Sequence, residues 1–361
     1  MGWQASDVAK EVLEKEAKSR LISLRDIKKD QIEDYFKIIS SQLLTMADNR
    51  MIIDGTVAFK RAFRLHPKQV SNSGLSIKDK LRALKTYYNK DFADEYSRRN
   101  GARNLDKTPL YDQLDAQSIS LQYEFIFKNP HPLGSKELLD TPADNSKYAR
   151  IHKIYHYHIR NFLKQFEYYD IFIVDPKTGD IVYSVFKELD YTTSLIDGPY
   201  AQSGIGQAFA QANKMKPGEY SLVDFAPYTP SYDDAASFIA TPIFEGEKKL
   251  GILIFQMPID RINNLMLQHK KWLEVGLGDS GETYLVNENY MMRSDSRFFI
   301  ENPDSFDVNK ITAIDQASLN NIKTKNNVFQ DLDFYILKNI DLLEMEEDPD
   351  QNQNSDETIY V

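Results

Sequence analysis

The fold is decided by the stretch Tyr168-Tyr-Asp-Ile-Phe-Ile-Val174, Asp175-Pro-Lys-Thr-Gly-Asp180, Ile181-Val-Tyr-Ser-Val-Phe186. β-Branched and aromatic residues fill the outer two segments, and Asp, Pro and Gly mark the segment between them. This pattern predicts two strands joined by a turn. A helix is expected near Gly206–Ala212, and further strands are expected at Tyr220–Phe225, Ser237–Phe244 and Leu250–Met257. The segment Glu245-Gly-Glu-Lys-Lys249 predicts a hairpin turn between the last two strands.

This order of elements is that of a PAS-like α+β module, in which an antiparallel sheet closes over helices and leaves a pocket on one face. A connecting helix is expected at Ile259–Glu274. After it, the strand–turn–strand pattern returns in Gly281–Val286, Asn287–Asn289 and Tyr290–Ser294. The sequence therefore predicts two such modules in tandem. The second is expected to be incomplete, because no strong strand pattern follows about Gln330.

The N-terminal region predicts one long helix. Apolar residues recur at steps of three and four from Leu21 to Leu43, and neither Pro nor Gly interrupts Ser6–Asn49. Such a helix fits a stalk or dimer seam, or a helix laid along its own domain. We predict a long helix at 1–49, a membrane-distal module with a mostly helical insertion at 50–258, a connecting helix and partial membrane-proximal module at 259–335, and an acidic tail without order at 336–361.

Composition excludes several kinds of partner and site. The net charge is −10, with Lys and Arg scattered among acids, so neither nucleic acid nor an anionic membrane surface is an expected partner. The absence of Cys excludes disulfides and thiolate metal sites. No apolar run approaches about 18 residues, the length that spans a bilayer. The N-terminus also lacks a secretory signal pattern, so any membrane spans are expected outside this sequence.

Two glycine motifs have non-catalytic interpretations. Gly276-Leu-Gly-Asp-Ser-Gly281 matches G-x-G-x-x-G, but a helix precedes it and a strand follows, the reverse of a dinucleotide site. We interpret it as an inter-domain turn. Gly278-Asp-Ser-Gly281 also matches the nucleophile loop of trypsin-like proteases, but the helical N-terminal half cannot supply the two-barrel scaffold that this chemistry needs.

The histidines and acids offer candidates for metal or acid–base chemistry. His152 and His156 lie one helical turn apart, a spacing that can hold a divalent metal, and His158 is nearby. The pattern H-E-x-x-H is absent, and packed or solvated histidines are the alternative interpretation. The candidate acids come without a second element that specifies a reaction; they are Asp170, Asp175, Glu188, Asp190 and Asp224. We therefore expect no enzyme activity, no cofactor and no metal site.

A ligand pocket is the more informative hypothesis. Its predicted residues cluster at the end of the second strand and beside the later strands; they are Tyr183, Ser184, Lys187, Asp190, Tyr191, Asp224, Tyr228, Ser237 and Phe238. In a zwitterionic or carboxylate-bearing metabolite, Lys187 would match the anion and Asp190 an amine, while aromatic walls exclude water. The alternative is that Lys187 and Asp190 form a surface pair and the tyrosines fill the sheet.

These segments resemble the sensor region of methyl-accepting chemotaxis proteins with double Cache domains. The resemblance covers roughly residues 10–330 and is most specific from Tyr168 to Arg297. Besides the opening stretch, the segments that resemble this family are Tyr228–Tyr232, Ala236–Pro242, Gly251–Gln256, Gly276–Val286 and Met292–Arg297. Similar sensor regions occur on histidine kinases and nucleotide cyclases. The pattern of Arg and Trp before Tyr and Asp that binds amino acids in some of these sensors is absent here.

The resemblance implies a function in signal transduction. It implies a long helix rising from a first membrane span, a distal module that binds a small metabolite, and a proximal module. The chain is then expected to be the periplasmic ligand-binding sensor of a transmembrane chemoreceptor, and we expect a homodimer formed through the N-terminal helix. The alternatives are a metal-dependent hydrolase and an interaction module without a ligand.

Overall fold

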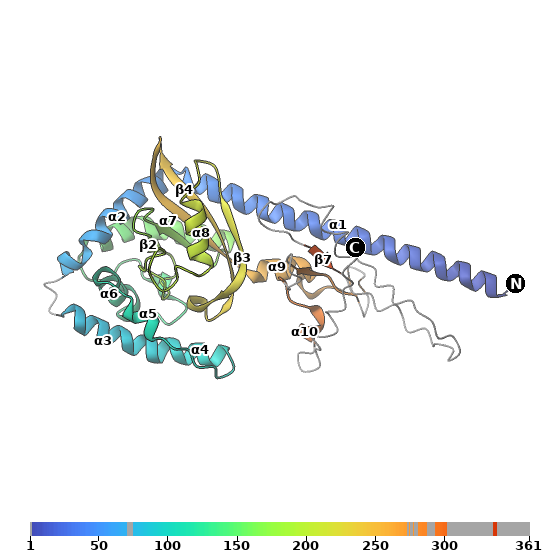
Figure 1. Ribbon diagram of the computed structural model, residues 1–361, viewed down its shortest axis with the longest axis horizontal. Helices are drawn as coiled ribbons and strands as arrows, with labels where there is room; N and C mark the ends of the chain where they lie inside the picture. The colour runs from blue at the N-terminus through green and yellow to red at the C-terminus, as the bar shows by residue number, and fades with distance from the viewer. Residues whose placement is uncertain are drawn as a thin grey trace. The chain divides into compact units, whose positions relative to one another are not determined.

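The computed structural model describes residues 2–70, 75–272, 274, 277, 281–286, 293–301 and 335–337 (Figure 1). The chain forms two compact units. Unit 1 comprises Met1–Ile38 and Ile259–Val361, and unit 2 comprises Ile39–Pro258. The long helix α1, Gly2–Ala47, contributes to both units. The domain boundaries proposed above at residues 49, 258 and 335 stay predictions.

A five-stranded antiparallel sheet is the centre of unit 2, with the order β2-β1-β5-β4-β3. Its strands are β1 Asp170–Val174, β2 Ile181–Ser184, β3 Ser221–Tyr228, β4 Asp234–Glu245 and β5 Lys248–Pro258. The first hairpin pairs Phe172 with Ser184, and β1 pairs on its other side with β5, where Phe172 lies opposite Ile254. This order confirms the predicted PAS-like α+β sheet, and all five predicted strands are present.

The hairpin between β4 and β5 also follows the sequence prediction. Glu245 pairs with Lys248, so only Gly246 and Glu247 form the turn. Gly246 has a φ of +57°, a conformation that costs glycine little because it has no Cβ.

Helices cover both faces of this sheet. On one face lie α2, Arg50–Val70, and α7, Lys147–Phe166. A Cβ on Gly251 of β5 would stand 2.6 Å from Thr56 Cγ2, so glycine permits the close approach of α2. On the other face lies α8, Gly204–Ala212, whose first residue is so close to Phe238 that a Cβ there would stand 3.1 Å from the ring.

The region between α2 and α7 is mostly helical, as predicted, and is interrupted around Asn129–Gly134. Its elements are α3 Ile77–Tyr87, η1 Tyr88–Phe92, α4 Ala93–Arg99, α5 Thr108–Asp112, α6 Ala116–Gln122, η2 Tyr123–Phe127 and η3 Lys136–Leu138. Side-chain caps start several of these helices: Ser76 accepts from the N–H of Asp79 in α3, and Asp115 from that of Ser118 in α6. Ser146 starts α7 in the same way.

This helical insertion holds the loop that follows β2. Gln122 at the end of α6 donates to the carbonyls of Leu189 at 3.2 Å and Tyr191 at 2.8 Å. Ser118 donates to the carbonyl of Thr192 at 2.8 Å. The backbone on both sides of Asp190 is therefore fixed by a helix that lies far away in the sequence.

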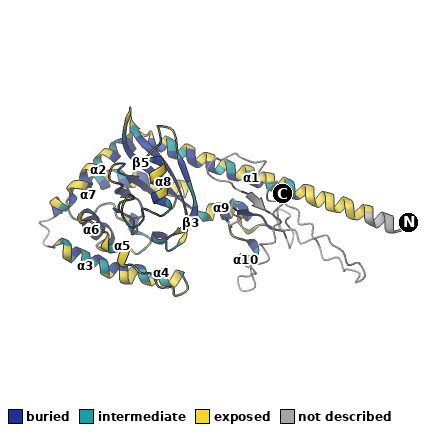
Figure 2. Cartoon of the chain, in the orientation of Figure 1, coloured by how far each residue is buried: buried dark blue, intermediate teal, exposed yellow. Residues whose placement is uncertain are grey.

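Unit 1 contains most of α1 and the described residues after β5. Its further elements are α9 Ile259–Met266, η5 Gln268–Lys270, β6 Tyr284–Val286, α10 Arg297–Glu301 and β7 Tyr335–Leu337. Lys28 of α1 is buried and donates to the carbonyl of Leu265. The N-terminal part of α1 is exposed from residue 8 to residue 20, as the yellow stretch in Figure 2 shows.

Unit 1 differs from the sequence prediction at two places. The connecting helix ends at Met266 rather than Glu274, since His269 adopts a positive φ of 53°. A strand that was not predicted, β7, pairs with β6 and places Leu285 opposite Ile336. Glycines 276 and 278, the turn at 287–289, the start of the strand predicted at 290–294, and tail residues 338–361 lie outside the described residues.

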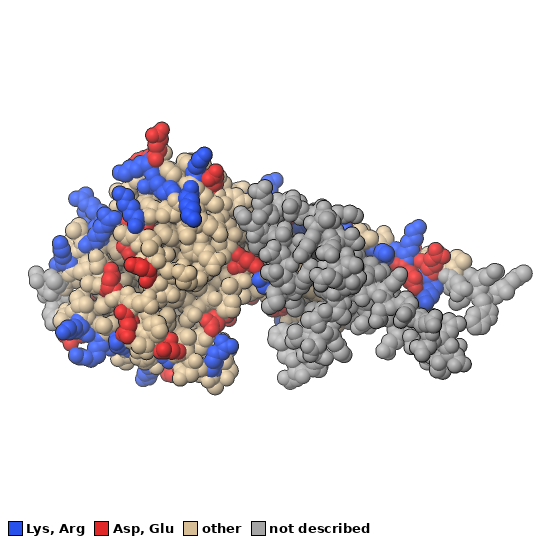
Figure 3. Space-filling model, in the orientation of Figure 1, with Lys and Arg blue, Asp and Glu red and all other residues tan. Residues whose placement is uncertain are grey.

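Figure 3 shows Lys and Arg interspersed with Asp and Glu over the visible face of unit 2. Among the described residues, no helix combines the length and the hydropathy needed to cross a bilayer.

Candidate functional site

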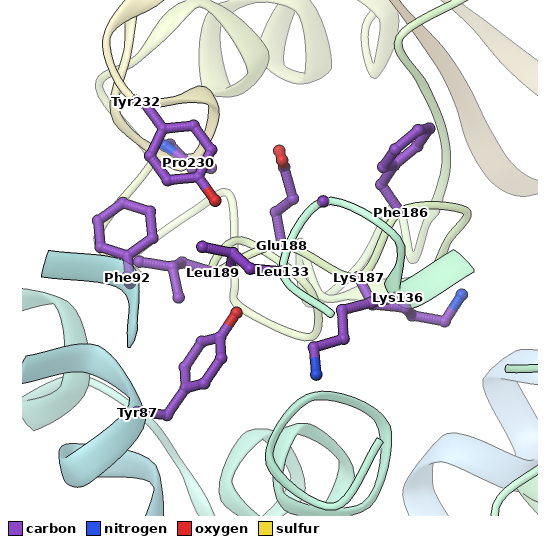
Figure 4. A pocket seen from close by; sticks show the side chains of 11 residues that line it. Tyr87, Phe92, Leu133, Lys136, Phe186, Lys187, Glu188, Leu189, Pro230 and Tyr232 are labelled. Atoms are coloured by element: carbon purple, nitrogen blue, oxygen red, sulfur yellow. The ribbon is translucent and has the colours of Figure 1, made fainter. Parts of the chain in front are cut away.

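A hollow in unit 2 lies between the helical insertion, the loop after β2 and the turn between β3 and β4. It contains about 290 Å³ of empty space, part of it open to solvent. Figure 4 shows its lining residues: Tyr87, Phe92, Leu133, Gly134, Lys136, Phe186, Lys187, Glu188, Leu189, Pro230 and Tyr232. The hollow therefore combines aromatic walls with one acid and two lysines.

Three carboxyl groups lie at and beneath the hollow. Asp170, the first residue of β1, accepts from the backbone N–H groups of Ile171 at 2.6 Å and Val185 at 2.8 Å. Asp190 is fully buried and accepts from the hydroxyl of Tyr228. Two further hydroxyls donate to Glu188, whose side chain lines the hollow; they are those of Tyr169 at 3.0 Å and Ser231 at 3.4 Å.

Lys187 is a buried cation that accompanies these acids. Lys187 is 2% exposed, and its ammonium donates to the carbonyls of Ser184 and Val185. The ammonium also lies over the ring of Tyr183, 4.7 Å from its centroid, and over that of Tyr191 at 5.4 Å. Lys187 has a positive φ of 60°, a strained backbone conformation of the kind that is concentrated at functional sites.

The electrostatic environment disfavours charge on all four groups. Burial raises the pKa of Asp170, Glu188 and Asp190, the last to about 6. The nearby charge of Asp190 raises the pKa of the other two acids further. Burial lowers the pKa of Lys187, and the charge of Asp170 opposes this shift in part. None of the four forms an ion pair within 4.0 Å with a described residue.

Three buried polar atoms without a hydrogen-bond partner lie on the face of the sheet that carries Asp170. Asp190 Oδ1, Gln256 Oε1 and the hydroxyl of Tyr200 accept or donate no hydrogen bond among the described residues. Gln256 pairs across the sheet with Asp170 on one side and Phe238 on the other, so these side chains share a face. An unpaired buried polar group costs about 1–3 kcal/mol. A bound ligand or water molecule that completes these hydrogen bonds would offset this cost.

Of the nine predicted site residues, only Lys187 lines the hollow; six others are buried in two groups, one around Lys187 and one around Asp190. Lys187 lies with Tyr183 and Tyr191, and Ser184 supplies one of its carbonyl partners. In the second group, Asp190 accepts from Tyr228, whose ring packs edge-on to Phe238 with centroids 5.0 Å apart. Lys187 and Asp190 are both buried and do not form the surface pair that was the alternative interpretation.

The other two predicted residues lie elsewhere. Ser237 is buried, but it precedes Phe238 in β4 and so points to the opposite face, where its hydroxyl donates to the carbonyl of Val223 at 2.7 Å. Asp224 is partly exposed and accepts from the N–H of Phe225 at 2.7 Å.

Several lining residues were not predicted. Tyr87, Phe92 and Lys136 come from the helical insertion, where no sequence pattern marks them as pocket residues. Tyr232 could have been found, because it ends the segment Tyr228–Tyr232 that carries the sequence resemblance.

The histidine cluster is engaged in packing. His156 bonds to the hydroxyl of Tyr183 at 2.8 Å and to the carbonyl of Glu137 at 2.6 Å, so both of its ring nitrogens are used. His152 bonds to the carbonyl of Asp140 and stacks on His156 with centroids 4.1 Å apart. His158 is exposed. Within the described part of the chain, no three His, Asp or Glu side chains are grouped so that they could hold a metal ion.

No family model matches this chain, and no curated protein matches it. Among solved structures, the chain is similar to the ligand-binding domain of the Pseudomonas fluorescens chemoreceptor CtaA in complex with L-isoleucine, with 13% identity, coverage of 38% of this chain and 46% of that chain, and a TM-score of 0.25. The chain thus spans less than half the length of that domain.

Two further similar structures are covered more completely. The sensory domain of the Campylobacter jejuni chemoreceptor Tlp3 with isoleucine bound is 12% identical, with 76% of this chain and 82% of that chain covered and a TM-score of 0.31. The sensor domain of the V. cholerae histidine kinase DctB is 15% identical, with 67% and 76% covered and a TM-score of 0.29. All three are sensory or ligand-binding domains. The fold assignment itself rests on the strand order and register described above.

Proposed function

We propose that this chain is the extracytoplasmic, ligand-binding part of a bacterial transmembrane receptor, and that it is not an enzyme. The module at 50–258 binds a small metabolite, and the bound state biases the packing of the sheet against its helices. The membrane spans lie outside this sequence, and the chain functions on the periplasmic side of the inner membrane.

One observation carries this proposal: buried charged and unpaired polar groups lie together beneath a hollow. Asp170, Asp190 and Lys187 are desolvated without an ion pair, and Asp190 keeps an oxygen without a partner. Burying such groups destabilises the folded state unless something completes their hydrogen bonds. A ligand that does so binds the folded state alone and stabilises it.

A thermal-shift screen of the purified chain tests the proposal. The panel contains carboxylates, amines, amino acids, purines and divalent metals. We expect a saturable shift from one organic class, equivalent to about 2.7 kcal/mol at a hundred times Kd. Asp190→Asn should reduce it, whereas Asp197→Asn, at an exposed position in the same loop, should not.

Other results would contradict the proposal in different ways. A shift with divalent metals only, lost in His152→Ala, would favour the metal-dependent hydrolase. No shift with any member of the panel would favour an interaction module without a ligand.

We also propose that the chain forms a homodimer through α1. This helix exposes large apolar side chains: Val8 is 60% exposed, Val12 51%, Ile27 51% and Ile38 56%. Val8 and Val12 lie about one turn apart, and Ile27 and Ile38 about three turns apart, so each pair shares a side of the helix. A second copy of α1 would remove these side chains from water.

A further inference from the structure

The helices α2 and α7 form a basic layer on one face of the sheet. The sequence of α7 contains five Lys and Arg residues and no Asp or Glu. That of α2 contains five Lys and Arg residues and a single acid, Asp54. The whole chain has more acids than bases, 54 against 44, so these two helices differ in charge from the rest of the protein.

The two helices lie side by side and antiparallel (Figure 1). Near the end of α2, the side chain of Gln69 accepts from the backbone N–H of Lys147, the first residue of α7, at 2.8 Å. Near the start of α2, a Cβ on Gly55 would stand 3.3 Å from the ring of Tyr155. Each helix is about 30 Å long, so the pair is large enough to cover much of a standard protein interface, which buries about 800 Å² per partner.

Exposed cations and exposed apolar side chains alternate on this layer. Val57, Arg61 and Leu65 of α2 are all exposed and recur at steps of four, so they share one side of the helix. Arg150 and Ile154 of α7 are exposed with the same spacing, and Ile154 is 58% exposed. Each helix therefore presents a cation next to a large apolar side chain.

Some of these cations have no acid beside them. Arg61, Arg150 and Lys153 are exposed, and none of them forms an ion pair within 4.0 Å with a described residue. Arg64, by contrast, pairs with Asp175 at 2.7 Å. The unpaired cations repel one another, and negative charge supplied by another molecule would relieve this repulsion.

We propose that the exposed side of α2 and α7 is a docking surface for an acidic, amphipathic segment of a partner protein. Carboxylates of the partner pair with Arg61, Arg150 and Lys153, and its apolar side chains cover Val57 and Ile154. The acidic remainder of the chain repels the same partner, so charge directs it to this face. The docking surface is separate from the proposed ligand site, because none of these five residues lines the hollow.

An anionic membrane fits the same surface less well. A helix that binds a membrane inserts a continuous apolar side about 5–10 Å into the lipid. The apolar sides of α2 and α7 are already buried inside unit 2, as Phe59, Phe63 and Ile159 show. Separate apolar side chains among cations instead match a protein interface, in which complementary charge sets the choice of partner.

Binding of labelled peptides to the full chain, measured by fluorescence anisotropy at low salt, tests the inference. The first peptide is an amphipathic Glu–Leu helix of about the length of α7. The second has Gln in place of every Glu, and the third is poly-glutamate of equal length. We expect the Glu–Leu peptide to bind most tightly, and its affinity to fall several-fold between about 50 and 500 mM salt, because salt screens exposed charges.

Charge reversal on the chain tests which residues carry the binding. A variant that combines Arg61→Glu, Arg150→Glu and Lys153→Glu should bind the Glu–Leu peptide about tenfold or more weakly, because each exposed charge pair is worth up to about fivefold in affinity. Lys214→Glu combined with Lys216→Glu is the control. It changes the net charge in the same direction at exposed positions between α8 and β3, and should leave the affinity unchanged.

A further variant tests the apolar part without altering charge. Ile154→Ser should weaken the Glu–Leu peptide several-fold, because it removes an exposed apolar side chain that the peptide would cover. This variant keeps the test decisive if the triple charge reversal folds poorly. Binding insensitive to Ile154→Ser would contradict the apolar contact.

Each other result would overturn the inference in its own way. Equal binding of the Gln–Leu peptide would show that charge is not recognised, and equal binding of poly-glutamate would show that the apolar side chains are not. Tighter binding of phosphatidylglycerol vesicles would assign the surface to a membrane, and self-association lost in the triple variant would assign it to a second copy of the chain. Failure of every peptide to bind would refute the docking surface, while a hit in the thermal-shift screen would leave the proposed sensor in place.

Discussion

Replacing Asp190 by Asn should change how stability depends on pH. Burial raises the pKa of Asp190 from 3.8 to about 6 in the folded state. The folded state thus holds this proton more tightly than the unfolded state does. The stabilising effect of the protonated carboxyl is full below about pH 4 and is lost as the pH rises through about 6. In Asp190→Asn, no proton titrates at this position.

The magnitude follows from the two pKa values. Each unit of difference corresponds to about 1.36 kcal/mol, so the wild-type chain loses about 2–3 kcal/mol between about pH 4 and pH 7.5 through Asp190 alone. The amide that Asp190→Asn introduces would add a cost that does not vary with pH, because Oδ1 of Asp190 has no partner. The stability of the variant relative to wild type should therefore rise by about 2–3 kcal/mol over this range.

Urea unfolding at several pH values measures this difference. The chain's two Trp residues, Trp3 and Trp272, lie outside unit 2, so near-UV circular dichroism of the tyrosines is the suitable signal. Asp197→Asn, at an exposed position, is the matched control and should follow the wild-type profile. Parallel pH profiles for wild type and Asp190→Asn would refute the reasoning, because they would show that Asp190 ionises as easily in the folded state as in the unfolded one.

Two other predictions concern packing and assembly. Gly251→Ala should lower the free energy of unfolding of unit 2 by about 1–3 kcal/mol, because the new Cβ would stand 2.6 Å from Thr56 Cγ2. Thr56→Ser removes that methyl group, so the double variant should regain part of this stability in urea unfolding. A double variant as unstable as Gly251→Ala would contradict the contact. Ile27→Asp should weaken dimerisation at least tenfold, as measured by sedimentation velocity. Ile154→Asp, at a similarly exposed position on α7, should leave dimerisation unchanged. A wild-type chain that is monomeric at all concentrations would rule out the proposed dimer.

The sequence by itself determined the strands of unit 2 and the class of its fold. Alternating β-branched and aromatic residues between turn residues are a local signal, because the side chains of a strand must fit a pleated, buried surface. The strands around Asp175–Asp180 and the two-residue turn at Gly246 were therefore predictable. The long helix α1 was also predictable, because its apolar spacing continues without a helix breaker.

Only the tertiary structure decided on which face of the sheet each candidate residue lies. Ser237 and Phe238 are adjacent in sequence, but strand alternation directs them to opposite faces, and pairing with β5 decides which face meets α8. Tyr87 and Tyr232 are 145 residues apart and meet only because the helical insertion folds over the loop after β2. Contacts between distant segments depend on the packing of whole elements, so local patterns do not encode them. The same packing buries Lys187 against backbone carbonyls and places Glu188 in the lining of the hollow, where the hydroxyls of Tyr169 and Ser231 donate to its carboxyl group.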